Sequence, residues 1–249
     1  MTKIKFGNQF DDSKADFKFD SRSDSSTEVS VGDQYDRSQR TVSVRDDAQV
    51  AKDRFVTILF VAANPLDTGR LALDEEFRDL TRALQGTDGT RFSIVPLFAA
   101  RPDDLVSALN EHRPAIVHFS GHGSEDGQFL FAATQGTQHV SISAIADLLA
   151  TAPAPIALVF LNACYLDGYA AELCEAVSCV IAMTTAVPDD IACEFSRGFY
   201  ASIGAGRSIA DSFKQALAVL HIQELDRTAP RLTTGSAVDT GSMSFGRRD

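Results

Sequence analysis

The chain has 249 residues, of which 44% are hydrophobic and 23% charged, and its 34 acids outnumber its 23 bases to give a net charge of −11. This length suits one substantial domain with an appendage, or two small domains, and it can bury a core. The acidic balance argues against nucleic acid or an anionic membrane as a partner, no apolar run is long enough to span a bilayer, and the N-terminus lacks a signal-peptide hydrophobic region.

Four cysteines stand at positions 164, 174, 179 and 193, and no two of them form a C-x-x-C pair. Neither a disulfide framework nor a zinc site is indicated, so we expect a reduced, cytoplasmic protein without a metal or another cofactor. Residues 1–54 hold 10 bases and 11 acids, which leaves almost the whole net charge on the rest of the chain. This change in composition predicts a boundary near residues 51–54.

Residues 1–50 contain two copies of one pattern, at 4–19 (IKFGNQFDDSKADFKF) and 29–44 (VSVGDQYDRSQRTVSV), offset by 25 without a gap. Each copy has two short alternating apolar runs, which is the period of strands with one buried face. A Gly-Asn or Gly-Asp step follows the first run, where a turn is expected. The pattern predicts a β-rich repeat segment.

Two such copies bury too little apolar surface to fold alone, so one interpretation is that copies from several chains stack. In this architecture the segment resembles the two-repeat β-solenoid motifs of signalling amyloids, which cluster effector domains. That resemblance implies homotypic assembly, or binding of a partner protein, through residues 1–50. A small β-meander packed on the main domain and a flexible segment remain open alternatives.

The remainder alternates strands and helices in chain order. Strands are predicted at residues 55–62, 92–98, 115–120, 156–163 and 179–184. Helices are predicted at residues 71–84, 103–111, 143–149, 169–176, 190–203 and 208–220, with a hairpin-like insert at 128–140. Apolar, β-branched strands separated by amphipathic helices predict an α/β fold: a doubly wound, mainly parallel sheet with helices on both faces. Residues 226–249 are expected to form a flexible C-terminal tail.

In such folds the active site lies beyond the carboxyl ends of the strands. His122 follows the third predicted strand and Cys164 follows the fourth, so the two meet at one edge if these strands are neighbours. A thiol beside an imidazole is the minimum equipment for nucleophilic catalysis, because the base raises the thiolate fraction. The glycines beside His122 allow close approach of a substrate, and the N–H of Gly123 can stabilise an oxyanion.

At these residues the sequence resembles the CHAT family of caspase-like cysteine peptidases, related to caspases, metacaspases and separases. Ser-Gly-His-Gly at 120–123 matches the family's histidine motif and Asn-Ala-Cys at 162–164 its cysteine motif, and the match extends over residues 55–225. The resemblance implies a cysteine endopeptidase with a protein substrate. In it Cys164 is the nucleophile, His122 the general base and acid, and the N–H groups of Gly123 and Cys164 the oxyanion hole.

The residue two positions before the cysteine departs from the metacaspase pattern. Metacaspases carry an aspartate two residues before the cysteine, where it binds a basic side chain, and this chain has Asn162 there. Asn162, Asp167 and Asp189 are therefore candidate substrate-binding residues, with Asp190 as a further acid nearby. A preference for arginine or lysine does not transfer.

Several alternatives stay open at this stage. One alternative is that the caspase-like domain serves as a catalytically silent scaffold. Another is a cysteine hydrolase of the α/β type, which carries its nucleophile on a G-x-C-x-G elbow. The second is disfavoured because Asn162 and Leu166 stand where that elbow has glycines. His118 and His122 are four residues apart but lie on a strand and a loop, so they do not form a helical zinc pair. Family context suggests bacterial immunity or cell death.

Overall fold

The computed structural model describes residues 28–31, 40–43, 55–65, 72–85, 92–184 and 187–245. The chain divides into two units, Met1–Arg54 and Phe55–Asp249, at the point where the charge balance of the sequence changes. None of the described helices is both long and apolar enough to cross a bilayer.

In the N-terminal unit, β1 (Glu28–Val31) and β2 (Arg40–Ser43) pair antiparallel, with Val29 opposite Val42. These two strands are the alternating runs of the second repeat copy. The first copy, residues 4–19, lies outside the described residues. The equivalence of the two copies and their stacking between chains therefore stay predictions.

The second unit contains one mixed sheet with the strand order β10-β9-β8-β5-β3-β4 among the described residues. Its strands are β3 (Val56–Ala63), β4 (Phe92–Phe98), β5 (Ile116–Gly121), β8 (Leu158–Asn162), β9 (Cys179–Met183) and β10 (Pro230–Thr234). All neighbours are parallel except β10, which runs antiparallel to β9. The predicted mainly parallel α/β sheet is confirmed.

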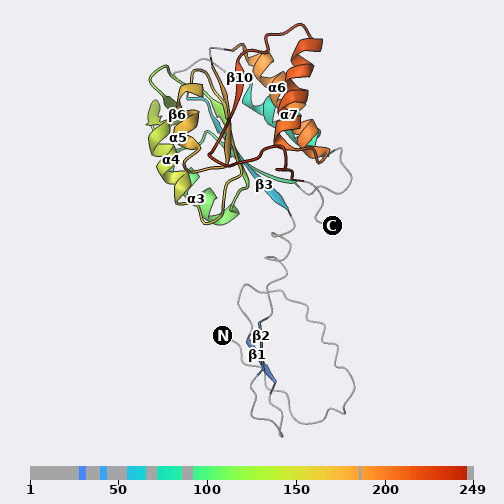
Figure 1. Ribbon diagram of the computed structural model, residues 1–249. Coiled ribbons are helices and arrows are strands. Elements are labelled where there is room, and N and C mark those ends of the chain that lie inside the picture. The colour runs from blue at the N-terminus through green and yellow to red at the C-terminus, as the bar shows by residue number, and fades with distance from the viewer. Residues whose placement is uncertain are drawn as a thin grey trace. The chain divides into compact units, whose positions relative to one another are not determined.

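Helices cover both faces of this sheet (Figure 1). One face carries α2 (Leu73–Gln85), α6 (Asp189–Gly204) and α7 (Ile209–Ile222). The other carries α3 (Pro102–His112), α4 (Ile142–Ala150), the short α5 (Ala170–Leu173), and the hairpin of β6 (Gln128–Ala132) and β7 (Thr137–Ser141). Because β3 alternates, Leu59 and Val61 face the second layer while Phe60 faces the first.

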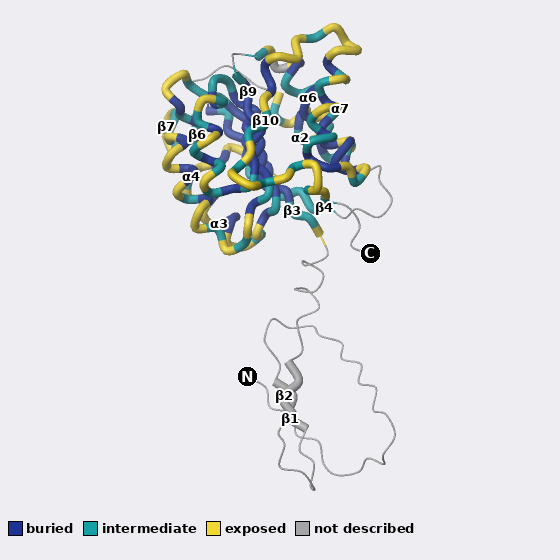
Figure 2. The backbone as a smooth tube through the Cα atoms, viewed as in Figure 1, coloured by how far each residue is buried: buried dark blue, intermediate teal, exposed yellow. Residues whose placement is uncertain are grey.

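The central strands are buried on both sides, as Figure 2 shows by their dark blue colour between the helices. Residues 58–63 of β3 are all 0% exposed, which explains why this segment reads as a continuous apolar run rather than an alternating one. Such a close-packed core fixes the positions of the carboxyl ends of the strands, where the loops of the candidate site begin.

Three predicted boundaries are corrected by the structure. The strand predicted at residues 156–163 is shorter, at Leu158–Asn162, and the helix predicted at 169–176 is reduced to the 3-10 turn η1 (Asp167–Tyr169) and α5. The predicted flexible tail contains β10, whose Leu232 lies opposite Ile181 of β9. The edge of β9 offers unpaired N–H and C=O groups, and their pairing orders a segment whose own sequence is only weakly strand-like.

Candidate functional site

His122 and Cys164 follow two strands that are direct neighbours in the sheet. β5 and β8 are parallel, and Ser120 pairs in register with Asn162 at their carboxyl ends. His122 and Cys164 each stand two residues beyond this pair, so the shared register carries both to the same edge of the sheet. The adjacency on which the sequence argument depended is confirmed.

The loops that begin at these two residues pack tightly against each other. We call residues 122–127 the histidine loop and residues 164–169 the cysteine loop. A Cβ atom built on Gly123 would lie 2.2 Å from the main-chain oxygen of Cys164, and one built on Gly127 would lie 2.2 Å from the ring of Tyr169. Both glycines therefore lie where the two loops touch, and Gly127 also has φ +73°.

Main-chain pairing and local strain also shape the two loops. The carbonyl oxygen of His122 accepts a hydrogen bond of 3.0 Å from the N–H of Leu130, which ties the histidine loop to β6. Tyr165, directly after Cys164, has φ +64°, a left-handed conformation that is unfavourable for a residue with a large side chain. Residues in such sparsely populated conformations cluster at functional sites.

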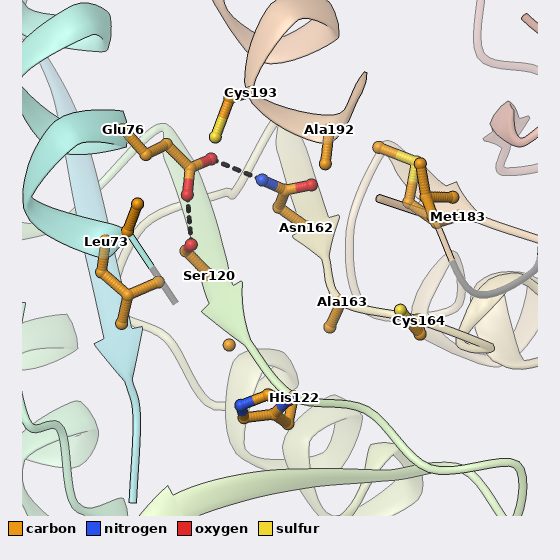
Figure 3. A pocket seen from close by; sticks show the side chains of 13 residues that line it. Leu73, Glu76, Ser120, His122, Asn162, Ala163, Cys164, Met183, Ala192 and Cys193 are labelled. Carbon is orange, nitrogen blue, oxygen red and sulfur yellow. Dashed lines mark hydrogen bonds between the residues drawn. The ribbon is translucent and has the colours of Figure 1, made fainter. Parts of the chain in front are cut away.

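A cavity of about 260 Å³ opens between the two loops and the first helical layer. Figure 3 shows Glu76, Ser120 and Asn162 at one end of this pocket and His122 and Cys164 at the other. The described residues that line it are Ala72, Leu73, Glu76, Ser120, Gly121, His122, Asn162, Ala163, Cys164, Met183, Val187, Ala192 and Cys193.

Glu76, on α2, is the centre of a buried polar network beneath the pocket. Its side chain is only 4% exposed. Oε1 accepts hydrogen bonds from His118 Nε2 at 3.1 Å and from Asn162 Nδ2 at 2.5 Å, and Oε2 accepts one from the hydroxyl of Ser120. One carboxylate thus joins the ends of β5 and β8 at the paired residues that precede His122 and Cys164.

The charge of Glu76 is stabilised by its partners. Burial alone would raise the pKa of this carboxyl, but the hydrogen bond and charge of His118, with the hydrogen bonds from Ser120 and Asn162, hold the pKa below its ordinary value of 4.5. His118 Nδ1 also shares a hydrogen bond of 3.1 Å with the hydroxyl of Tyr200. Burial, with a smaller contribution from the charge of Glu76, raises the pKa of Tyr200, so its phenol stays protonated.

Asn162 differs from the other members of the network because one of its polar atoms has no partner. An ionised carboxylate only accepts hydrogen bonds, so the amide nitrogen of Asn162 must face Glu76 and the amide oxygen must face away. That oxygen is buried and accepts no hydrogen bond. It turns toward the side of the pocket where Met183 and Ala192 lie (Figure 3).

The structure describes the surroundings of two of the three acids that the sequence offered near the cysteine, Asp167 and Asp190. Asp167 is in η1 and forms an ion pair of 3.8 Å with Arg231 of β10. Asp189 begins α6, and its side chain is outside the described residues. Asp190, in the first turn of α6, accepts a hydrogen bond from the N–H of Ile191 at 2.9 Å. Neither Asp167 nor Asp190 is among the described lining residues, whereas Asn162 is.

Four residues that line the pocket were not predicted from the sequence: Glu76, Met183, Val187 and Cys193. For Glu76 a signal was present: it stands three residues after Leu73 and four before Leu80, on the apolar face of the helix. An acid on that face must be buried and paired. Acids in the first turn of a helix are also favoured by the helix dipole, so the acidic start of α2 does not by itself single out Glu76. Among the described residues, no group of three or more His, Cys, Asp or Glu side chains is arranged to hold a metal ion.

Comparison with known proteins places the fold and the family. The CHAT domain family matches residues 26–232, and the chain belongs to this family. The match begins well before residue 55 and therefore includes β1 and β2. The family match therefore begins before the domain boundary near residues 51–54 that the composition predicts.

Two protein relatives carry the word protease in their names. A "Probable protease" of Gillisia limnaea is 24% identical over 153 residues, which is 60% of this chain and 27% of the relative. A "Roc-COR-CHAT protease" from an unknown prokaryotic organism is 22% identical over 177 residues, which is 68% of this chain and 17% of the relative. The chain spans about a quarter or less of these relatives.

Solved structures show the same fold. A secreted C11 cysteine protease from Bacteroides thetaiotaomicron matches with a TM-score of 0.55 and 15% identity, covering 73% of this chain and 66% of that one. The Drosophila initiator caspase Dronc matches with a TM-score of 0.51 and 13% identity, covering 77% of this chain and 86% of that one. The fold is caspase-like.

Proposed function

We propose that this chain is a cysteine endopeptidase in which Cys164 is the nucleophile and His122 the general base and acid. The observation that carries the proposal is the position of these two residues, one at the end of each of two adjacent parallel strands, on a shared pocket. The proposal is further supported by membership of the CHAT family and by relatives named as proteases.

In the proposed reaction, His122 accepts the proton of the Cys164 thiol, and the sulfur attacks the carbonyl carbon of a peptide bond. The N–H groups of Gly123 and Cys164 stabilise the oxyanion that forms. The C–N bond then breaks, His122 gives its proton to the departing amine, and a thioester remains on Cys164. A water molecule, deprotonated by His122, attacks the thioester, releases the acid and restores the thiol.

The network around Glu76 supports this chemistry indirectly. Glu76 holds Ser120 and Asn162 together, and these residues immediately precede the segments that carry His122 and Cys164. A fixed separation between base and nucleophile matters because small displacements from the productive geometry slow such reactions severely. We therefore assign Glu76 as a positioning residue.

The proposal extends to how the enzyme is controlled. Residues 1–50 would bring copies together, by self-assembly or through a partner protein, and raise the local concentration of the peptidase domain. An effector of this kind fits bacterial immunity or cell death in the cytoplasm. Fused to a reporter, residues 1–50 are expected to form β-rich filaments, and a monomeric, unstructured product at high concentration contradicts this part.

The catalytic proposal is tested by reacting the purified full chain with an electrophilic peptide and measuring the intact mass. The experiment is run on the chain alone and on a fusion clustered through an inducible dimerising domain. We expect one adduct, on Cys164, that is absent from Cys164→Ala and unaffected in Cys174→Ala, a matched control whose thiol contacts the carbonyl of Thr233. His122→Ala should react at least about 100-fold more slowly.

The second candidate function is a catalytically silent, caspase-like scaffold that only binds a partner. It predicts that no electrophilic peptide labels Cys164, clustered or not. It also predicts that His122→Ala has no effect on the reactivity of the thiol. Either result would favour the scaffold over the peptidase.

A further inference from the structure

We infer that the pocket beside Cys164 binds an uncharged substrate side chain, and that the Glu76–Asn162 pair determines this choice. The inference rests on the proposed function and adds the chemical class of the residue at P1, the position on the acyl side of the scissile bond. Asn162 thereby becomes a specificity-determining residue, and Glu76 fixes its orientation.

The position of the pocket identifies the side chain that it receives. Both His122 and Cys164 line it. In the proposed reaction the carbonyl carbon lies against the sulfur of Cys164, and the P1 side chain leaves the backbone one bond from that carbon. The adjoining cavity is therefore the space that the P1 side chain enters, and its volume of about 260 Å³ admits a side chain of medium size.

Six of the thirteen described lining residues carry apolar side chains and form an apolar part of the wall. They are Ala72, Leu73, Ala163, Met183, Val187 and Ala192. A methionine or leucine side chain in such a cavity exchanges water for apolar contacts, which favours binding in proportion to the area covered. The charged group of an ionised side chain gains nothing from this wall and loses its hydration.

The one carboxylate on the described wall is already occupied. Glu76 is 4% exposed and accepts hydrogen bonds from His118, Ser120 and Asn162. The burial of Glu76 and the three donors around it leave little room for a cationic P1 side chain to approach its carboxylate. At the end of β8, where a carboxylate would attract such a cation, the chain presents the neutral amide of Asn162, with its oxygen turned away from Glu76 (Figure 3).

The test compares three electrophilic peptides that differ only at P1, which is methionine, lysine or glutamate, three side chains of similar length. The rate of adduct formation at Cys164 is measured on the full chain, alone and clustered. We expect the methionine peptide to react at least about tenfold faster than the other two. A lysine or glutamate peptide that reacts as fast or faster overturns the inference while leaving the peptidase intact. If none of the three reacts although iodoacetamide modifies Cys164, the proposed function fails, and the inference with it.

A charge-transposed variant tests the role of the pair. Glu76→Gln/Asn162→Asp moves the carboxylate from α2 to the end of β8 and keeps the hydrogen bond, because the new amide donates to the new carboxylate. We expect the lysine peptide to gain at least about tenfold relative to the methionine peptide. Glu76→Gln alone, which removes the charge without placing one on β8, should still disfavour lysine. If the double variant folds and its preference between the lysine and methionine peptides is unchanged, the role of the pair is overturned. If the double variant does not fold, the comparison of the three peptides on the wild type still decides whether the P1 side chain is charged or uncharged.

Discussion

Replacing Gly123 with alanine tests whether contact between the histidine and cysteine loops sets the geometry of the site. The added Cβ would lie 2.2 Å from the oxygen of Cys164 and 3.0 Å from Cγ of Leu166. A carbon and a carbonyl oxygen normally stay about 3.3 Å or more apart, so the loops must separate by about 1 Å. Overpacking of this kind costs about 1–3 kcal/mol of folding free energy, and a displacement of about 1 Å slows catalysis by about 100-fold.

The matched control for this variant is Gly168→Ala, in the cysteine loop that Gly123 contacts, because nothing lies within 4 Å of a Cβ atom at that position. Urea unfolding gives the stability of each variant, and the rate of labelling of Cys164 by an electrophilic peptide gives the reactivity. We expect Gly123→Ala to be less stable and to react more slowly than the wild type, and Gly168→Ala to match the wild type in stability and rate. If Gly123→Ala matches its control in stability and rate, the two loops do not depend on close contact and the geometric argument is wrong.

Three further predictions concern the buried groups. Glu76→Ala leaves the donors of His118, Ser120 and Asn162 without an acceptor. Urea unfolding should show its free energy of unfolding lowered by about 3–5 kcal/mol. The control Glu75→Ala, at an exposed position of the same helix, should change the free energy of unfolding by less than about 1 kcal/mol. Because the pKa of Glu76 is lowered from 4.5, the stability that its charge contributes is present above that pH and is lost as the pH falls through the folded-state pKa. The stability difference between wild type and Glu76→Gln should therefore shrink between about pH 6 and about pH 3, and a constant difference would contradict the assignment of the charge. Burial raises the pKa of Cys179 to about 12, so brief alkylation of the folded protein near neutral pH should leave it unmodified in peptide mapping; a modified Cys179 would show that β9 opens.

The sequence was sufficient to predict the parallel part of the sheet and the two strands that carry the candidate site. Runs such as residues 55–62 can bury themselves only in the middle of a parallel sheet, and the two short motifs fall where such strands end. Local pattern therefore determined both the class of the fold and the positions of His122 and Cys164. Their meeting needed one further fact, the adjacency of β5 and β8, which the structure supplies.

The network beneath the pocket could not be predicted in the same way. Glu76 contacts His118 and Asn162 across 42 and 86 residues of sequence, and these contacts exist only once α2 packs over the ends of both strands. The same applies to β10, which is ordered by the open edge of β9 rather than by its own composition. Asp167 illustrates the reverse case: it lies close to Cys164 in sequence, but its partner is Arg231.

The central claim is that Cys164 and His122 cleave a protein substrate. The measurement that tests it most directly is a proteome-wide comparison of new protein N-termini in cells that express the wild type, Cys164→Ala or His122→Ala at equal levels. We predict a set of N-termini present only with the wild type, with uncharged residues immediately before the cleaved bonds. The same set of N-termini in the Cys164→Ala cells would contradict the claim.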